Sequence, residues 1–459
     1  MKLTRRIGNL LKRSGDWIGG IGTSTGYSAG SGSGRWSAGT YLSAPVAQTH
    51  AAAGIVGRRS AGAVGNIPLA ASLTETQTNS CIPDMPSVRS GYPNASTAAA
   101  LQVDFQAFAP LEFLRNMERS RFVNGEAVAL MRTDRRGRLR LQQLPPEQLD
   151  RTVNRELPDG GRIIAGVETD ATDAIVAYHI LHDAPDLAFA MIGPAQRVPA
   201  DDVIHVFEAK FPGQRRGISE LTPVLAPLHE LEKFQDALIA RAGTAALFGG
   251  FVVDPNGSAF GDASKPPDSE LSLEPGAMRI LPPGADIRFP NMPDNADAPA
   301  LLRYRQRDIC SGVGIPYELA TGDLSATNYS SAKLGLEAYK RRIKALRASL
   351  LVPKMFEPIY RRWVLLEILS GRLHAPDFFR DPEPYFRVSF LFPEWAALDP
   401  LKDTQADVLA LSAGLRSRAE IIAARGRDVQ DVDREIAADT FRPVAPLTAL
   451  TQETQNAAA

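Results

Sequence analysis

The 459-residue sequence contains only two cysteines, Cys81 and Cys310, and lacks any apolar run of the ~18 residues that a membrane-spanning helix needs. Two cysteines so far apart do not make a disulfide framework, which indicates folding in a reducing compartment. The basic start, MKLTRRIGNLLKRSGDWIGGIG, lacks the long apolar core of a secretory signal. We therefore expect a chain that neither enters a membrane nor depends on disulfides.

The sequence also lacks an excess of charge of either sign. It has 51 Lys and Arg against 52 Asp and Glu, for a formal net charge of -1. A protein that grips nucleic acid along its whole surface is basic. Any contact with DNA is therefore expected to be local or weak.

Motifs for catalysis and for metal binding are missing as well. Gly22–Gly26 and Gly26–Gly30 match G-x-S-x-G, but they lie in a low-complexity segment without the strand and helix of a nucleophile elbow. His179 and His182 lie on opposite faces of an expected strand, with no Cys or His pair nearby, so we interpret them as structural. No P-loop motif occurs. The sequence predicts no enzyme, no metal site and no cofactor.

What the sequence does contain first is a Gly-, Ser- and Ala-rich beginning, for example GTSTGYSAGSGSGRWSAG. Such composition buries little apolar surface, so we expect a flexible N-terminal arm over residues 1–95.

The fold class predicted for the remainder is α+β. A helical pattern starts at Asp104 and ends at Gly125, which is a typical C-cap residue. Short runs rich in β-branched residues follow, at 126–133, 138–144, 161–170, 174–181 and 202–209. The sequence DRRG between the first two predicts a hairpin.

Long helices alternate with small inserts further along. A helical stripe covers 218–247, with Pro227 marking either a kink or the true helix start. A Pro- and Gly-rich insert with two expected strands follows at 248–292, and a second helix is predicted at 297–313. A polar loop then precedes a helix whose apolar seam is Ala332, Leu336, Tyr339, Ile343, Leu346 and Leu350.

The C-terminal part predicts a closing strand, YFRVSFLFP, and then short helices. Asp399 followed by Pro400 is an N-cap signal, Ser417 with Glu420 is a capping box, and Gly414 and Gly426 are expected C-caps.

Four blocks in this order carry a resemblance: RVPADDVIHVFEAKFPGQRRGISELTPVL (197–225), LEPGAMRILPPGADIRF (273–289), GIPYELATGDLSATNYSSAKLG (314–335) and DPLKDTQADVLALSAGLRSRAEIIAARGRD (399–428). Over roughly residues 100–440 the chain resembles the portal proteins of tailed double-stranded-DNA phages, in the lambda-like branch. Gene transfer agents use the same machinery.

The resemblance implies a ring of about twelve subunits at one capsid vertex, with an axial channel for double-stranded DNA. It implies the following parts: an arm (1–95), an α/β wing (96–217), a stem helix (218–247), a small α/β clip (248–292), a second stem helix (293–314), a tunnel loop (315–331), a wing spine with a closing strand (332–398) and a helical crown with a tail (399–459). Implied partners are the terminase large subunit, the head-tail adaptor and the major capsid protein. The implied location is the virion, with assembly in the host cytoplasm.

The resemblance also implies candidate site residues. The DNA-facing tunnel loop would comprise Asp323, Leu324, Ser325, Ala326, Thr327, Asn328 and Tyr329. Basic residues that meet either DNA or a neighbouring subunit, or simply form a solvated helix face, are Arg303, Arg305, Arg307, Lys333, Lys340 and Arg341. The clip residues expected to contact the motor and the adaptor are Arg279 and Arg288.

Two other classes of protein remain as alternatives. One is another structural virion protein, such as a head-tail adaptor, with a different subunit number. The other is a virion enzyme, which would need a catalytic constellation that the sequence does not offer.

Overall fold

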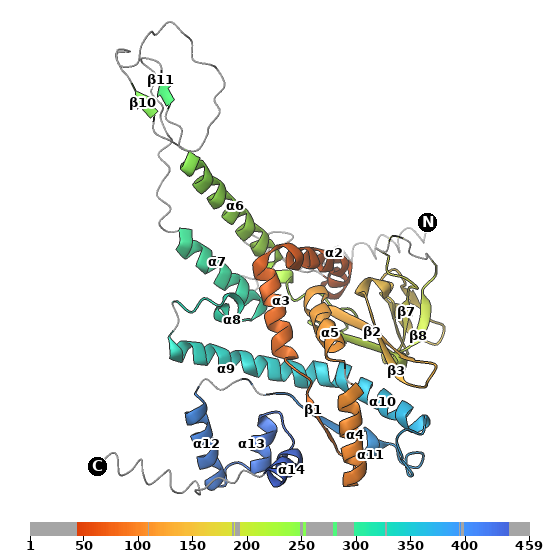
Figure 1. Ribbon diagram of the computed structural model, residues 1–459. Helices are drawn as coiled ribbons and strands as arrows, with labels where there is room; N and C mark the ends of the chain where they lie inside the picture. The colour runs from red at the N-terminus through yellow and green to blue at the C-terminus, as the bar shows by residue number, and fades with distance from the viewer. Residues whose placement is uncertain are drawn as a thin grey trace, which may run out of the picture.

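The computed structural model describes residues 44–108, 110–185, 188, 193–247, 251–253, 279–281, 298–325, 328–393, 395 and 399–439. Figure 1 shows a mixed body of helices and sheets, from which one pair of helices projects. Three short helices lie below the long horizontal helix of the body.

The segment before residue 95 is not a flexible arm throughout, so this prediction is wrong for residues 45–90. Helices α2 (Pro45–Asn66) and α3 (Pro68–Cys81) pack against each other, and both pack against α5 (Leu111–Asn124). Ala70 and Leu73 are fully buried in the main core. The Ala-rich composition favours helix, and small side chains let helices approach closely. Residues 1–43 lie outside the described residues.

The helix expected from Asp104 to Gly125 is two helices. Helix α4 (Ala95–Phe108) ends before Pro110, and α5 begins at Leu111. Gly125 ends α5 with φ of 88°, as predicted. A Cβ at Gly125 would lie 2.0 Å from the backbone carbon of Ile218, so only glycine fits where these two segments cross.

Two antiparallel sheets, of three and five strands, lie within the body. The first has the order β3-β2-β9, from β2 (Glu126–Thr133), β3 (Leu139–Leu144) and β9 (Val203–Phe207). The second has the order β4-β5-β6-β7-β8, from β4 (Arg155–Glu156), β5 (Arg162–Ile164), β6 (Val167–Thr169), β7 (Ile175–Ile180) and β8 (Gln196–Pro199). The predicted hairpin at DRRG is confirmed. The segment 161–170 is a hairpin rather than one strand, turning at Ala165 and Gly166, which both have positive φ.

The projecting pair consists of α6 (Leu225–Leu247) and α7 (Ala298–Val313), which run in opposite directions (Figure 1). Helix α6 starts seven residues later than predicted, after a 3₁₀ turn at Thr222–Val224, so Pro227 lies in its first turn and does not kink it. At the far end, β10 (Phe251–Val253) pairs in parallel with β11 (Arg279–Leu281).

A continuous helical rod crosses the body. It comprises α9 (Tyr329–Leu346), a π-helical stretch η7 (Arg347–Phe356) and α10 (Glu357–Leu369). Pro353 lies inside the stretch, and its missing N–H and its ring interrupt the regular α-helical hydrogen bonds there. Tyr339, Ile343 and Leu350 of the predicted seam are buried, whereas Leu336 is half-buried.

The closing strand β12 (Val388–Leu391) pairs with β1 (Ser87–Ser90), after a short helix α11 (Glu383–Phe386). Phe105 on α4 meets Tyr360, Trp363 and Phe390 edge to face, with ring centroids 5.1–6.4 Å apart. The strand therefore closes over the aromatic part of the core.

The last three helices are α12 (Pro400–Ser412), α13 (Arg418–Ala424) and α14 (Val429–Ala438). The predicted caps are confirmed: Asp399 accepts from the Lys402 amide at 3.2 Å, and Ser417 accepts from the Glu420 amide at 3.1 Å. Gly414 and Gly426 adopt the positive φ of C-cap residues. None of the three helices contains a buried residue.

Candidate functional site

The beginning of the predicted tunnel loop is a folded helix rather than a loosely held chain. Helix α8 (Tyr317–Thr321) ends at Gly322, which has φ of 71°. Tyr317 and Ala320 are buried, and the Ser72 hydroxyl of α3 donates to the Ala320 carbonyl. The expectation of a loop throughout 315–331 is therefore wrong for its first part, which is helical and anchored in the core. Only residues 322–328 connect α8 to α9.

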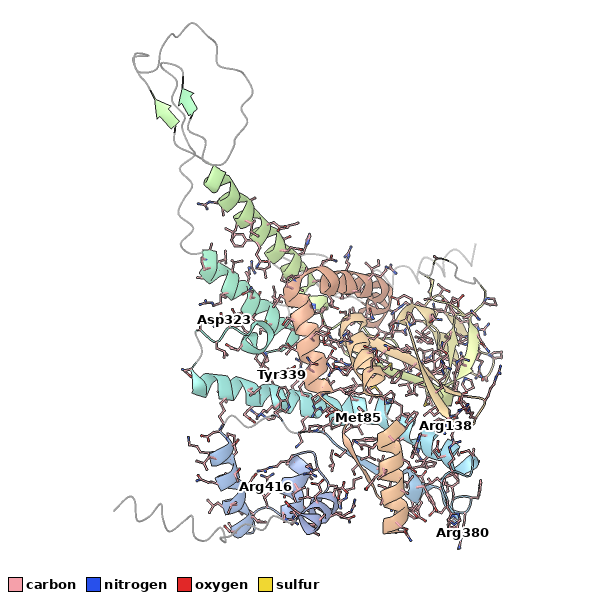
Figure 2. All side chains as sticks on the ribbon, in the orientation of Figure 1. Met85, Arg138, Asp323, Tyr339, Arg380 and Arg416 are labelled. Atoms are coloured by element: carbon pink, nitrogen blue, oxygen red, sulfur yellow. The ribbon has the colours of Figure 1, made fainter. Side chains whose placement is uncertain are left out.

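Asp323 is the centre of a small hydrogen-bond network at the base of this connection (Figure 2 labels the residue). Its Oδ1 accepts from the Ser325 amide at 3.0 Å and from the Ser325 hydroxyl at 2.6 Å. Its Oδ2 accepts from the Tyr317 hydroxyl at 2.8 Å and lies 3.5 Å from Arg303 Nε. The Ser325 bonds, followed by the Tyr317 bond, lower the pKa of Asp323 to about 2. The carboxylate is therefore charged at neutral pH and fastens the loop to α7 and α8.

The tip of the connection is more exposed. Leu324 is 66% exposed, and Ser325 and Asn328 are exposed too. Ala326 and Thr327 lie outside the described residues, and Tyr329 is the first residue of α9 rather than a loop residue.

The arginines predicted on the second stem helix each contact a neighbouring side chain. Arg303 meets Asp323, as above, and Arg305 lies 3.8 Å from Asp308. The Arg307 guanidinium lies over the Tyr317 ring, 5.1 Å from its centroid. All three remain exposed, so they present positive charge on α7. Arg303 and Arg307 also link α7 to Asp323 and Tyr317, whereas the contact of Arg305 stays within α7.

The basic residues of α9 differ in their surroundings. Lys340 lies 3.0 Å from Glu337, Arg341 donates to the Glu337 carbonyl at 3.4 Å, and Lys333 is half-buried. Arg342, in contrast, donates to the Gly314 carbonyl at 2.8 Å and so joins α9 to the end of α7.

Arg347, at the start of η7, is a further basic residue, for which no role was predicted from the sequence. It is buried, and it donates to the carbonyls of Ser80 at 2.7 Å and Cys81 at 2.9 Å. Its position in the sequence, near the seam residues Ile343 and Leu350, could have indicated that its side chain points toward the core.

The clip residues are only partly described. Arg279 is the first residue of β11, and its side chain lies outside the described residues, as does all of Arg288.

A buried ionic cluster was not predicted. Glu126 is fully buried, and its carboxylate meets Arg216 at 2.7 Å, Arg151 at 2.6 Å and His205 Nε2 at 3.1 Å. Burial alone would raise the pKa of Glu126, but the charge of Arg216 and the hydrogen bond of His205 hold it well below its usual value. Burial lowers the pKa of His205. The sequence feature that could have indicated this cluster is the charged residue Glu126 at the start of an apolar strand.

No metal-binding cluster of three or more Cys, His, Asp or Glu occurs among the residues that the structure describes. His179 is buried against Glu168 at 2.9 Å, and His182 is exposed beside Asp183. No helix in the described ranges has both the length and the apolar character needed to cross a bilayer.

These features define the class of protein first. It is a mixed helix and sheet chain with a projecting pair of helices, a short loop held by Asp323 and a long helical rod. The model of a family described as phage portal protein, lambda family, matches residues 98–347, which is more than half of the chain. The chain therefore belongs to the lambda family of phage portal proteins.

Two curated relatives agree with this assignment. The chain is 27% identical over 316 residues to the probable portal protein of Halomonas phage phiHAP-1, covering 66% of this chain and 60% of that protein. It is 24% identical over 339 residues to the portal protein of Escherichia phage N15, covering 64% and 61%. The chain thus matches about six-tenths of the length of these relatives.

Solved structures with some likeness come from gene transfer agent (GTA) particles. A chain of the virion of a native GTA particle matches with 14% identity and a TM-score of 0.39, covering 80% of this chain and 91% of that one. A chain of the neck of a native GTA particle, computed with C12 symmetry, matches with 15% identity and a TM-score of 0.37, covering the same shares.

Proposed function

We propose that this chain is the subunit of a portal ring of about twelve copies at one capsid vertex, through which double-stranded DNA is packaged and ejected. The observation that carries the proposal is the family match over 98–347, which runs from α4 to the junction of α9 and η7. That span includes α6, α7 and the 322–328 loop, the parts that would surround a channel.

In this proposal, α6 and α7 form the stem, and the insert 248–292 forms the clip at its outer end. Burial along α6 supports the stem assignment. Leu228 and Leu231 are buried at its base, whereas Ile239 is 70% exposed further out. A helix pair with an apolar residue exposed beyond its base is suited to packing against neighbouring copies. Residues 96–217 would be the wing, 332–398 the spine and closing strand, and 399–459 the crown.

The loop 322–328 is proposed to face DNA without gripping it. B-DNA repeats every ~10–10.5 base pairs, so twelve loops cannot all meet a phosphate at once. The chemistry of the loop supports this role: its charged residue is an acid, Asp323, and the nearest arginine, Arg303, already lies against that acid. Weak, averaged contacts would let DNA slide.

The exposed basic residues of α7 and α9 have two roles in this proposal. They either face DNA or pair with acids of an adjacent subunit. Clip residues Arg279 and Arg288 are proposed to contact the terminase large subunit and then the head-tail adaptor. The major capsid protein would surround the ring. The chain would act in the virion after assembly in the host cytoplasm, and it would have no catalytic activity of its own.

The experiment that tests the proposal measures the mass of the purified particle and images it by negative stain. A closed ring of about twelve chains with an axial hole is the expected result. A monomer at every protein concentration would overturn the proposal. A ring with a different subunit number and no packaging defect on deletion of the gene would favour an adaptor instead.

A further inference from the structure

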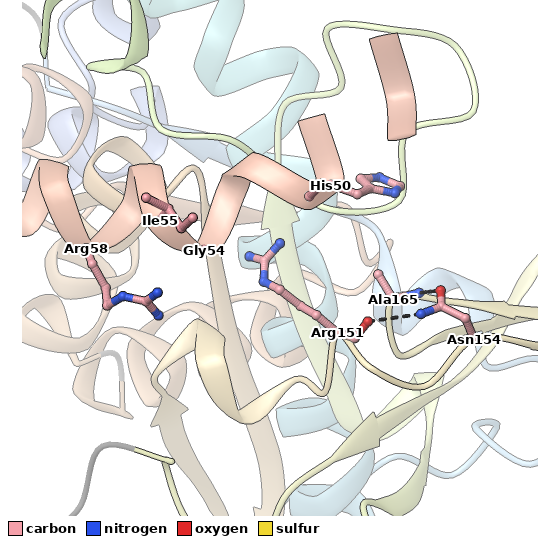
Figure 3. Close-up of a pocket in the computed structure, with 8 residues that line it drawn as sticks. His50, Gly54, Ile55, Arg58, Arg151, Asn154 and Ala165 are labelled. Atoms are coloured by element: carbon pink, nitrogen blue, oxygen red, sulfur yellow. Dashed lines mark hydrogen bonds between the residues drawn. The ribbon is translucent and has the colours of Figure 1, made fainter. Parts of the chain in front are cut away.

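A hollow of about 380 Å³ lies between α2 and the turns that follow Leu149 and Ile164 (Figure 3). His50, Gly54 and Arg58 of α2 line one side, and Arg151, Asn154 and Ala165 line the other. The figure shows the Arg151 guanidinium pointing toward α2, between the side chains of His50 and Arg58.

The hollow carries surplus positive charge. Arg216 is fully buried and donates to both carboxylate oxygens of Glu126, at 2.7 and 2.8 Å, so these two charges neutralise each other. Arg151 shares the same carboxylate through Nη2, and the charge of Glu147 also acts on Arg151. Arg58 is exposed and has no ion-pair partner in the described part of the chain.

One donor of Arg151 is unused. Its Nη1 atom is enclosed and has no hydrogen-bond partner within the ranges that the structure describes. A buried N–H without an acceptor is costly, and the cost is larger for a charged group. The neighbouring Asn154 makes other bonds: its Oδ1 accepts from the Ala165 amide at 2.8 Å, and its Nδ2 donates to the Arg151 carbonyl at 3.1 Å.

His50 adds a further donor without adding charge. Its Nε2 accepts from the Arg215 amide at 3.1 Å, which places the proton of the neutral ring on Nδ1. Burial and then the charge of Arg151 lower the pKa of His50, so the ring is neutral at pH 7.

The helix leaves the hollow open at Gly54. A Cβ built there would meet no atom within 4 Å. A side chain that starts at this position would therefore begin in free space.

We propose that this hollow binds a small oxyanion, namely a phosphate or carboxylate group, held by Arg151 and Arg58. Guanidinium groups recognise such oxygens through charge-assisted hydrogen bonds, and Arg151 supplies a nitrogen with no other acceptor. The proposal uses only residues on α2 and the sheet turns, and it does not depend on the ring or the channel.

The test measures thermal unfolding of the full chain in increasing inorganic phosphate, at constant ionic strength maintained with chloride. The unfolding temperature is expected to rise with phosphate concentration, as for any ligand that binds the folded state. Succinate replaces phosphate in a second series. A rise with both anions supports a general oxyanion site, and a rise with one of them assigns the site to phosphate or to carboxylate.

Two variants place the effect in the hollow. Arg58→Gln should weaken the apparent affinity about tenfold, the change expected for one charge-assisted hydrogen bond. Gly54→Leu should abolish the response by filling the space. Gly62→Leu is the matched control, because Gly62 lies on the same helix, has open space at its Cβ and is not part of the hollow. Absence of stabilisation by either anion, or a full response in Gly54→Leu, would overturn the proposal.

Discussion

The carboxylate of Glu126 receives side chains from three separate parts of the chain. Arg151 comes from the turn after Leu149, His205 from β9 and Arg216 from the segment before the 3₁₀ turn at Thr222–Val224. Arg216 also donates to the carbonyls of Pro146, Leu149 and Ala165, at 2.8–2.9 Å. This one cluster therefore joins the first sheet to the turns of the second.

Glu126→Ala should cost about 3–5 kcal/mol of unfolding free energy, because it leaves the buried Arg216 without its counter-charge. Denaturant unfolding measures the loss. The matched control is Glu75→Ala, which breaks an exposed pair with Arg119 and should cost only about 0–1 kcal/mol. Equal losses in the two variants would contradict the role given to burial.

The same cluster predicts acid sensitivity. Because burial lowers the pKa of His205, the unfolded chain binds a proton below pH ~6.5 that the folded chain does not. Stability should therefore be complete above that pH and decline as the pH falls. The lowered pKa of Glu126 adds a further decline below pH ~4.3.

Thermal unfolding measured between pH 5 and 7.5 tests whether stability declines as the pH falls. The unfolding temperature of the wild type should fall toward pH 5, and the slope should be shallower in His205→Gln. His50, whose pKa is also lowered, supplies part of the remaining slope. A slope that is identical in wild type and His205→Gln would exclude His205 as a cause.

Among the elements, the helical rod from Tyr329 to Leu369 contributes buried side chains to the core along much of its length. Ile343 is 1% exposed on its inner face, whereas Leu334, two and a half turns earlier, is 71% exposed. The rod thus buries one stripe of α9 and leaves another to solvent or to a neighbouring copy.

Ile343→Ala should cost about 2–5 kcal/mol, through lost burial and the cavity left behind. Leu334→Ala should change stability by about 0.5 kcal/mol or less, since little of its side chain is packed. Urea unfolding of the two variants side by side measures both values. The assignment of the inner face is wrong if Leu334 proves the more costly position.

The loop that follows α8 is an element of a different kind, because its contacts are few and local. Deleting 323–327 leaves Gly322 and Asn328 to join α8 to α9, and the chain should still fold because both helices keep their buried faces, at some cost from so short a connection. The deletion also removes Asp323. A small additional loss of stability is therefore expected, because Arg303 and Tyr317 lose their partner. DNA retention should fail, because under the proposed function the constriction is gone.

Particle size and protected DNA are the two measurements for this deletion. Normal particles with defective packaging support a channel role for the loop. Particles that no longer assemble would assign the loop to structure instead. The milder variant Asp323→Asn keeps the loop length and removes only the charge that holds the loop to α7 and α8. Faster proteolysis at Leu324 is the expected result.

The sequence was sufficient where local chemistry decides the structure. Gly125, Asp399 and Ser417 were predicted as caps, and all three have the expected geometry. It was insufficient where a partner lies far along the chain. Arg342 and Arg347 differ by five positions and by nothing in their own chemistry, yet Arg347 is buried against α3 because of tertiary packing. The Glu126 cluster, which spans 90 residues, was missed for the same reason.

At the scale of the whole molecule, the core extends beyond the region that the family model matches. The match starts at residue 98, but Ala70, Leu73 and Ile82 are fully buried in the same core as α5 and the rod. The Ser60 hydroxyl donates to that of Ser219 at 2.8 Å, which fixes α2 next to the base of the stem.

A chain that starts at residue 83 should therefore fail to fold or should aggregate, because it leaves the face of α5 that packs on α2 and α3 uncovered. A chain that starts at residue 44 should keep every described contact and remain soluble. Size-exclusion chromatography and circular dichroism of the two truncations provide the comparison. Equal solubility would mean that α2 and α3 are dispensable for the core.

The bonds from Arg347 to Ser80 and Cys81 have a consequence for synthesis on the ribosome. The two ends of the Arg347–Cys81 bond are 266 residues apart, so α3 leaves the ribosome long before its partner is made. At ~5–20 residues per second, this wait lasts some tens of seconds. During that time α3 can pack against α2 and α5, but its part that faces α8 and the rod lacks its partners, and such long-range closure is slow. Production of this protein should therefore be sensitive to the supply of chaperones and to translation rate, more than its final stability would suggest.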